Sequence, residues 1–310
     1  PLRSASTWAW EVTLDSSSEA ILNISLYPYL FPIFDGAGLV LMNSEKVKWI
    51  QCRLDGIKEK DSAKFDLMPD FAACDPSLYT PEDAYETEKP LLIAARMKYS
   101  DSRFPIIYGG PYWSARDGID VVFETKMNYG TDGLGELLNY QAHICKNMEN
   151  HTSKGVYMWK AGFMLVRVKH GHAESIKKSL WHTPGSYALF SNFVTSSDEY
   201  PSWKVALKCL CHLRGLRLMD HGFLGRGGRG LVFEVTEVAA AEATEAKGGD
   251  GHVNSEDAPR FALKIVVGAE NSEELQLEYD VIRTRLQSCT GSKTLPVVSL
   301  PLNHEGCIPP

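Results

Sequence analysis

Two carboxylates and a lysine in the first half of the chain are the residue types found in centres that cleave phosphodiesters. Asp70 follows Pro69 within a predicted strand, and residues 118–126 read G-I-D-V-V-F-E-T-K. Because side chains alternate along a strand, Glu124 and Lys126 project from one face. Carboxylates hold Mg²⁺ or Mn²⁺, the ion acidifies a water, and a lysine positions that water or stabilises the phosphate. Two acidic groups and a lysine of this kind could therefore form a divalent-metal site with a cationic partner.

The second carboxylate has alternatives. Asp70 and Glu124 are 54 residues apart, so the interpretation requires an insertion at about residues 75–117. Asp117 or Asp120 could instead supply the carboxylate, and Asp120 is the better substitute because it shares a strand face with Glu124. An E-x-K triplet also arises on the solvated strand face of other α/β domains. That simpler interpretation stays open beside the metal site.

Helical and strand patterns surround these residues. Ser16 to Glu19 is a plausible helix N-terminus. The apolar segment 20–34 contains Pro28 and Pro32, so we predict a short buried helix followed by a loop. Further strands or helices are expected at residues 8–14, 47–53, 65–73, 132–148, 155–169 and 200–218. The helix at 132–148 carries Tyr140 and Gln141.

The order of these parts resembles the PD-(D/E)xK nuclease superfamily. An early helix is followed by P-D at a strand, E-x-K at the next strand and then a helix. The resemblance covers about residues 8–215 and implies a Mg²⁺- or Mn²⁺-dependent nuclease that acts on DNA. It gives Asp70 and Glu124 the metal, Lys126 the catalytic role, and Gln141 the place of the polar helper that many members carry on that helix.

A second group of residues could bind a polyphosphate. Gly225, Gly227 and Gly230 form G-x-G-x-x-G, Val232 follows, and the flanks look like two strands. Glycines let backbone N–H groups approach a phosphate chain, and the valine can pack against an adenine ring. The dinucleotide-binding fingerprint uses the same glycines but needs a helix after the last one. Here a strand follows, so we predict a hairpin with a glycine turn.

The residues after this hairpin continue in an informative order. A strand at 261–267 carries Lys264 in an A-x-K context, and a helix that begins at Ser272 carries Glu278. This order resembles the N-lobe of protein kinases. The resemblance implies that Lys264 pairs with the α- and β-phosphates of ATP, that Glu278 holds the lysine, and that a protein hydroxyl is the substrate. The simpler alternative is a glycine-rich hairpin with an exposed lysine.

Two features depart from a complete kinase. The connection from Gly230 to Lys264 is long, which we assign to an inserted loop at residues 239–259. No H-R-D-x-x-x-x-N or D-F-G sequence follows, so the catalytic base and the metal-binding Asp of a C-lobe are missing. Since the sequence also starts at Pro1, we expect it to be a fragment cut inside the kinase-like part.

Composition sets the remaining bounds. With 310 residues and 44% hydrophobic content, the chain can bury a core and its length favours two domains. Residues 1–217 carry 24 Lys and Arg against 25 Asp and Glu, and residues 218–310 carry 8 against 14, which disfavours strong nonspecific DNA binding. The longest apolar run, 20–40, is broken by polar residues and prolines, so no membrane span is expected. Seven cysteines without zinc spacing indicate reduced thiols in the cytoplasm or nucleus.

We therefore predict an α+β protein: a mixed-sheet nuclease-like domain at residues 1–217, then a β-rich kinase N-lobe with one helix at 218–310. The tandem order resembles Crinkler-type proteins of fungi and oomycetes, and related kinase-bearing proteins of mushroom-forming fungi. That resemblance implies an intracellular effector acting in a host cell. Three functions stay open: an ATP-binding kinase-like protein, a metal-dependent nuclease, and a non-catalytic scaffold of degenerate nuclease and pseudokinase.

Overall fold

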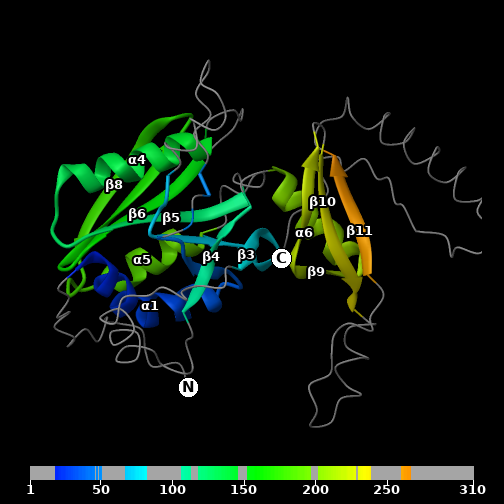
Figure 1. Cartoon of the computed structure of the whole chain (residues 1–310), viewed down its shortest axis with the longest axis horizontal. Helices are drawn as coiled ribbons and strands as arrows, with labels where there is room; N and C mark the ends of the chain where they lie inside the picture. The colour runs from blue at the N-terminus through cyan, green and yellow to red at the C-terminus, as the bar shows by residue number, and fades with distance from the viewer. Residues whose placement is uncertain are drawn as a thin grey trace, which may run out of the picture. The chain divides into compact units, whose positions relative to one another are not determined.

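The computed structural model describes residues 18–45, 47, 49–50, 67–81, 106–112, 118–145, 152–196, 202–227, 230–238 and 260–266. The chain divides into two compact units, residues 1–200 and 201–310 (Figure 1). Both combine helices with strands, so the α+β class expected from the sequence is confirmed.

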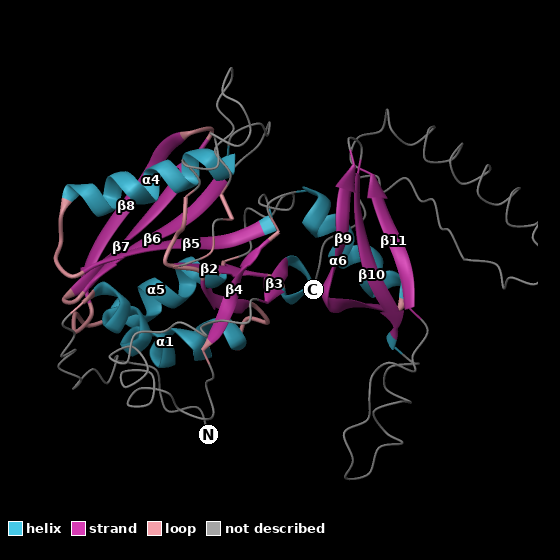
Figure 2. Ribbon diagram, viewed as in Figure 1, coloured by secondary structure: helices cyan, strands magenta, loops and turns pink. Residues whose placement is uncertain are grey.

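The described strands of the first unit form one eight-stranded mixed sheet in the order β3-β4-β1-β2-β5-β6-β7-β8 (Figure 2). Their bounds are β1 (Val40–Asn43), β2 (Phe71–Cys74), β3 (Tyr79–Pro81), β4 (Ile107–Pro111), β5 (Ile119–Lys126), β6 (Thr152–Trp159), β7 (Gly162–Lys169) and β8 (His172–Leu180). A short 3-10 helix, η2 (Pro76–Leu78), precedes β3.

The centre of the sheet places the catalytic candidates on neighbouring strands. Strand β2 pairs antiparallel with β5, and β5 pairs parallel with β6 in a register that sets Glu124 beside Tyr157. Parallel neighbours need a crossover, and helix α4 (Thr131–Cys145) supplies it. Helix α4 therefore begins only a short turn after Lys126.

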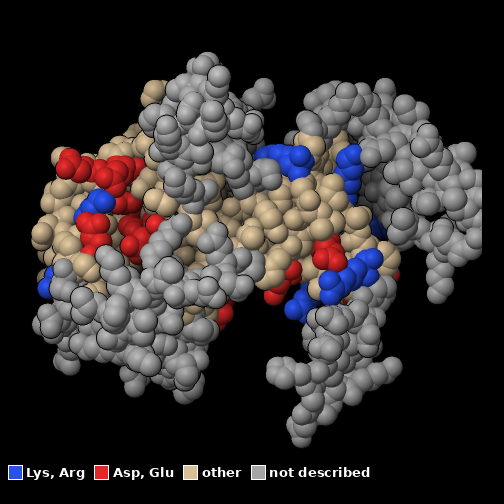
Figure 3. Space-filling view, in the orientation of Figure 1, with Lys and Arg blue, Asp and Glu red and all other residues tan. Residues whose placement is uncertain are grey.

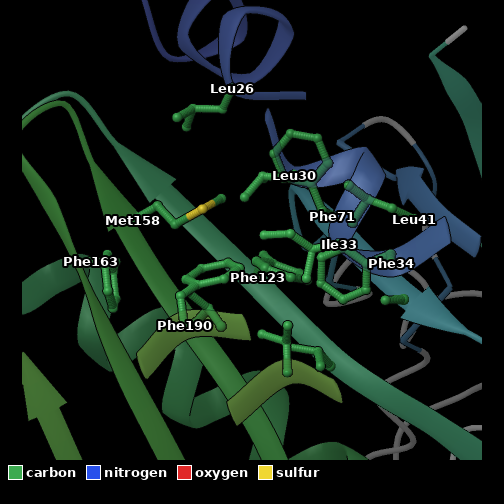
Figure 4. Close-up of a cluster of buried hydrophobic side chains, with 14 of the residues drawn as sticks. Leu26, Leu30, Ile33, Phe34, Leu41, Phe71, Phe123, Met158, Phe163 and Phe190 are labelled. Atoms are coloured by element: carbon green, nitrogen blue, oxygen red, sulfur yellow. The ribbon is translucent and has the colours of Figure 1, made fainter. Parts of the chain in front are cut away.

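Helices cover both faces of this sheet. Figure 1 shows α4 on one face, and α1 (Glu19–Asp35) with α5 (Ser186–Thr195) on the other. Between α1, α5 and the sheet lies a core that includes Leu30, Phe71, Phe123 and Phe190 (Figure 4). The rings of Phe71 and Phe123 meet edge to face at 6.1 Å, so adjacent strands of the candidate site share one rigid core.

The predicted break in the first helix was wrong. Helix α1 runs through Pro28 and Pro32 as one 17-residue helix, capped by Ser18, whose side chain accepts from the Ile21 amide. A proline inside a helix costs about 3 kcal/mol. Leu26, Leu30 and Phe34 are fully buried on this helix, and each contributes about 1.5–3 kcal/mol. Burial of that face therefore outweighs the two prolines.

The strand predictions were partly right. The first sheet strand is β1 at Val40–Asn43, whereas Ile50 makes only an isolated bridge with Leu67. The strand predicted at 65–73 is shorter and ends at Cys74 as β2. The described part of the expected insertion, 75–117, adds β3 and β4 to the sheet edge beside β1. The strand predicted at 8–14 lies outside the described residues.

The second unit contains a three-stranded antiparallel sheet in the order β11-β10-β9 among its described residues. Its elements are α6 (Ser202–Arg214), β9 (Leu216–Gly227), β10 (Gly230–Glu237) and β11 (Arg260–Val266). Trp203 of α6 stacks on Phe233 of β10, with ring centroids 5.9 Å apart. This helix, which we had expected to close the first domain at residue 217, thus packs in the second unit. The loop expected at 239–259 lies outside the described residues.

No helix in the described part of the chain combines the length and the apolar character that crossing a membrane requires.

Candidate active site

Asp70 sits at the start of β2, held against β5. Its backbone amide donates to the Phe123 carbonyl, and its Oδ2 accepts from the Thr125 amide at 2.6 Å. Its Oδ1 accepts from the side-chain amide of Asn23 on α1 at 3.0 Å. Asp70 is 8% exposed. The carboxylate is therefore fixed beside Glu124, although 54 residues separate the two in sequence.

Lys126 joins carboxylates from three elements. Its Nζ lies 2.6 Å from Glu124 Oε1 on β5 and 2.9 Å from Glu136 Oε2 on α4. Glu19, in the first turn of α1, lies 3.8 Å away. Figure 3 shows acidic side chains gathered around a basic one where β5 ends and α4 begins. We call Asp70, Glu124, Lys126 and Glu136 the acidic cluster.

A glycine lets α4 approach this cluster closely. A Cβ on Gly133 would lie 2.5 Å from the Tyr157 ring and 2.8 Å from Lys126 Cγ. Real Cβ atoms do not occur at such distances from neighbouring atoms. The absence of a side chain at Gly133 therefore sets how near Glu136, one turn later on α4, can come to Lys126.

Burial shifts the protonation of the two central carboxyls. It raises the pKa of Asp70 from 3.8 to about 7, helped by the charge of Glu45 and opposed by the Thr125 amide. It also raises the pKa of Glu124, with Asp70 and a hydrogen bond to Glu136 acting in the same direction. Two buried acids so close together resist carrying two charges. Protons thus occupy part of this cluster near neutral pH.

Of the two carboxyl groups of Glu124 and Glu136, one is protonated in preference to the other. A hydrogen bond joins the two carboxyl groups, so one of them must be protonated. Burial acts to raise the pKa of Glu136, but hydrogen bonds to Glu124 and Lys126 lower it overall. Glu124 therefore holds the proton and Glu136 carries the charge. For Lys126, burial acts to lower the pKa, but the bonds to Glu124 and Glu136 raise it, so the ammonium stays protonated.

The donor set fits a hard divalent cation. Mg²⁺ is commonly held by one or two carboxylates, with waters and substrate phosphates as its other ligands. Asp70 and Glu124 supply two such carboxylates, both buried and both resisting a second negative charge. Among the described residues, no group of three or more His, Cys, Asp or Glu could hold an ion alone. A cation here would therefore depend on solvent and substrate oxygens as well.

Two predicted site residues lie elsewhere. Gln141 is fully buried on α4, where its Nε2 donates to the carbonyls of Ser153 and Val166, so it ties the helix to β6 and β7. Asp120 is buried on the Glu124 face of β5, but four residues along a strand span about 13 Å. That distance favours Asp70 as the carboxylate that accompanies Glu124. Asp117 lies outside the described residues.

Sequence reasoning did not assign Glu19, Glu136 or Tyr140 to the site. Tyr140 is hydrogen-bonded to Glu124, and burial together with the Glu124 charge raises its pKa. Glu136 and Tyr140 lie four residues apart on α4, the helix predicted to follow E-x-K. This i, i+4 spacing places both side chains on one face of the helix, and it is the sequence signal that could have assigned them to the site. Glu19 carried no signal beyond its place near a helix N-terminus.

In the second unit the three glycines of the G-x-G-x-x-G sequence lie where two antiparallel strands meet. Gly225, Gly227 and Gly230 lie at the joined ends of β9 and β10. Val232 is directly opposite Gly225 on one side and Lys264 on the other. Cross-strand partners project from the same face of a sheet.

Val232 and Lys264 therefore share a face beside the glycine turn. Glu278, which we predicted as the partner of Lys264, lies outside the described residues. The described residues accordingly contain the strands of the expected nucleotide site but not its helix.

Comparison of the chain with protein-family models, with curated proteins and with solved structures finds no match.

Proposed function

We propose that the first unit is a divalent-metal-dependent phosphodiesterase acting on nucleic acid. The observation that carries this is the convergence of Asp70, Glu124 and Lys126, which come from two strands far apart in sequence and meet at one end of the sheet. Asp70 and Glu124 are costly to ionise together while both are buried, and a bound cation would offset that cost. A metal ion would supply the positive charge that the carboxylates of Asp70 and Glu124 require, and a phosphodiester would supply the negative charge that the Lys126 ammonium requires.

In this proposal Asp70 and Glu124 hold Mg²⁺ or Mn²⁺. The bound ion supplies a water of lowered pKa and neutralises charge on the phosphate. Lys126 cannot be the general base at neutral pH, because its pKa is raised and its ammonium keeps its proton. Its role is to donate hydrogen bonds to the phosphate as negative charge develops there. Glu136 holds the ammonium in place.

The test is cleavage of labelled DNA by the full chain with Mg²⁺ or Mn²⁺. Removing one donor to a developing charge reduces turnover by roughly 10²–10³-fold. We expect a loss of that size for Lys126→Ala, and none for Lys160→Ala, an exposed lysine in the turn after β6. Equal activity in wild type and Lys126→Ala would refute the assignment of this centre.

We propose as a second function that the glycine hairpin of the second unit binds ATP. The observation that favours it is the register that pairs Val232 with Lys264 beside the glycine turn. Mg-ATP should raise the Tm of the full chain, and Lys264→Ala should remove this gain. Lys208→Ala, an exposed lysine on α6, is the control. If Lys264→Ala keeps the full gain, the hairpin is not the nucleotide site.

A further inference from the structure

An exposed aromatic ring stands three residues after Lys126. Tyr129 is 47% exposed, yet its backbone is fixed on both sides. The hydroxyl of Tyr157 accepts from the Gly130 amide at 2.9 Å and donates to the Asn128 carbonyl at 3.1 Å. The Tyr129 ring also meets Trp159 at 5.1 Å. The turn after the catalytic strand thus holds a rigid ring at the surface.

A lysine from the edge of the sheet lies over this ring. Lys178 on β8 places its Nζ 3.4 Å from the centroid of the Tyr129 ring and 5.4 Å from that of Trp159. Lys178 is exposed, so this cation–π contact is weak and can be exchanged. The ring face that attracts a lysine also stacks on a nucleobase.

The strand registers connect this surface to the acidic cluster. Glu124 pairs with Tyr157, Tyr157 with Met164, and Met164 with Lys178. Paired residues project from the same face, so Lys178 shares the α4 face with Glu124. Three strand spacings correspond to about 14 Å. A few nucleotides span that distance.

The same face of β8 continues with exposed apolar residues. Ile176 is 49% exposed and Leu180 is 39% exposed, and both alternate in step with Lys178. Tyr129, Ile176, Lys178 and Leu180 thus form one surface of apolar contact area with a cation at its centre, beside a centre proposed to cleave phosphodiesters. We call this surface the Tyr129 platform.

We propose that the Tyr129 platform binds a single-stranded nucleic acid segment, with a base stacked on Tyr129 and a backbone phosphate at Lys178. The inference rests on the proposed phosphodiesterase and names its substrate: an unpaired strand rather than an intact duplex. Bases inside a duplex hide their faces from a protein ring, whereas an unpaired base exposes both. Lys178 supplies the phosphate contact once the base replaces its ammonium on the ring.

The test measures binding separately from cleavage. A labelled oligothymidine with a phosphorothioate backbone is titrated with the full chain in Ca²⁺, and fluorescence anisotropy is compared with that of a duplex of equal length. We expect Tyr129→Ala to weaken single-strand binding about 5- to 150-fold, the range of one stacked base. Tyr129→Phe, which keeps the ring, should bind like wild type, and Tyr129→Leu, which keeps only apolar bulk, should not.

A matched pair of lysines tests the phosphate contact. Lys178→Ala should reduce the slope of log affinity against log salt by about 0.7, the loss of one phosphate contact on a single strand. Lys177→Ala removes the same charge from the neighbouring residue, which projects from the other face of β8, and should leave the slope unchanged.

The platform proposal would be overturned by no oligothymidine binding, by equal binding of the duplex, or by equal affinity of wild type and Tyr129→Ala. A Tyr129→Leu variant that binds like wild type would indicate a merely apolar contact, as for a protein partner, and also overturns it. The experiments also distinguish failure of the phosphodiesterase proposal from failure of the platform proposal. Ring-dependent binding without cleavage refutes the phosphodiesterase alone, and Lys126-dependent cleavage with an unchanged KM in Tyr129→Ala refutes the platform alone.

Discussion

Replacing Glu124 by Gln tests the electrostatic account of the acidic cluster. Glu124 is 3% exposed, and burial, followed by Asp70 and the bond to Glu136, raises its pKa from 4.5 to about 9. Glutamine has nearly the same shape. Its carbonyl can still accept from Lys126 and its amide can donate to Glu136. We predict that the Glu124→Gln protein, free of divalent cations, is more stable than wild type at neutral pH.

The magnitude follows from the two pKa values of Glu124. In the unfolded chain this carboxyl ionises above pH 4.5, whereas in the folded protein it stays neutral up to about pH 9. Its contribution to stability is therefore complete below pH 4.5 and is lost as pH rises toward 9. At about 1.4 kcal/mol per pKa unit, the loss at pH 7 reaches about 3 kcal/mol. Glutamine avoids this loss, which corresponds to about 6–12 °C in Tm.

The assay is thermal unfolding of the full chain at several pH values in the presence of a chelator. The Tm difference between Glu124→Gln and wild type should be near zero at about pH 4.5 and should grow as pH rises. Glu174→Gln, which removes an exposed carboxylate from β8, should show no such growth. A Glu124→Gln protein that is less stable than wild type at pH 8, or whose difference does not depend on pH, would refute the reasoning.

Two further predictions follow from the same site. Gly133→Ala should be about 1–3 kcal/mol less stable than Gly135→Ala in urea unfolding, because a Cβ at Gly133 meets the Tyr157 ring whereas Gly135 faces open space; equal stability of the two variants would contradict the close approach of α4. Mn²⁺ affinity, measured by calorimetry, should increase with pH between 6 and 8, since binding must displace protons from Asp70 and Glu124. An affinity that does not change over this range would mean that Mn²⁺ binds elsewhere.

The sequence predicts a helix or strand well where apolar residues recur with the period of that element. The E-x-K strand and the helix after it have clear periodicities, and both appear as β5 and α4. Helix α1 was predicted as broken because prolines weigh heavily in local rules, whereas tertiary burial of Leu26, Leu30 and Phe34 decides the outcome.

Strand β8 was not predicted, because its sequence lacks a clear alternation of apolar and polar residues. Its sequence, H-A-E-S-I-K-K-S-L, is mostly polar, and its residues are exposed or half-buried at the sheet edge. Edge strands often carry charged residues, which prevent the strand from pairing with other chains. Apolar and polar residues therefore do not alternate clearly along such a strand. The pairing with β7 is set by the tight turn at His170 and Gly171, both with positive φ.

In the candidate site, too, some contacts could be predicted from the sequence and others could not. Glu124 and Lys126 could be paired from sequence because they are two residues apart on one strand. Glu136 could not, because its approach to Lys126 depends on how closely α4 packs, which Gly133 permits. Gln141 was given a chemical role from a resemblance, but its geometry ties α4 to the strands instead.

The most direct test of the central claim is a double-mutant comparison of metal-dependent DNA cleavage by the full chain. Rates are measured for wild type, Asp70→Asn, Lys126→Ala and the double variant, with Mn²⁺ and with a chelator. Residues that act as one unit lose activity non-additively. The account predicts that each single variant loses most of the activity and that the double variant loses little more. Cleavage by the double variant at the wild-type rate would contradict it.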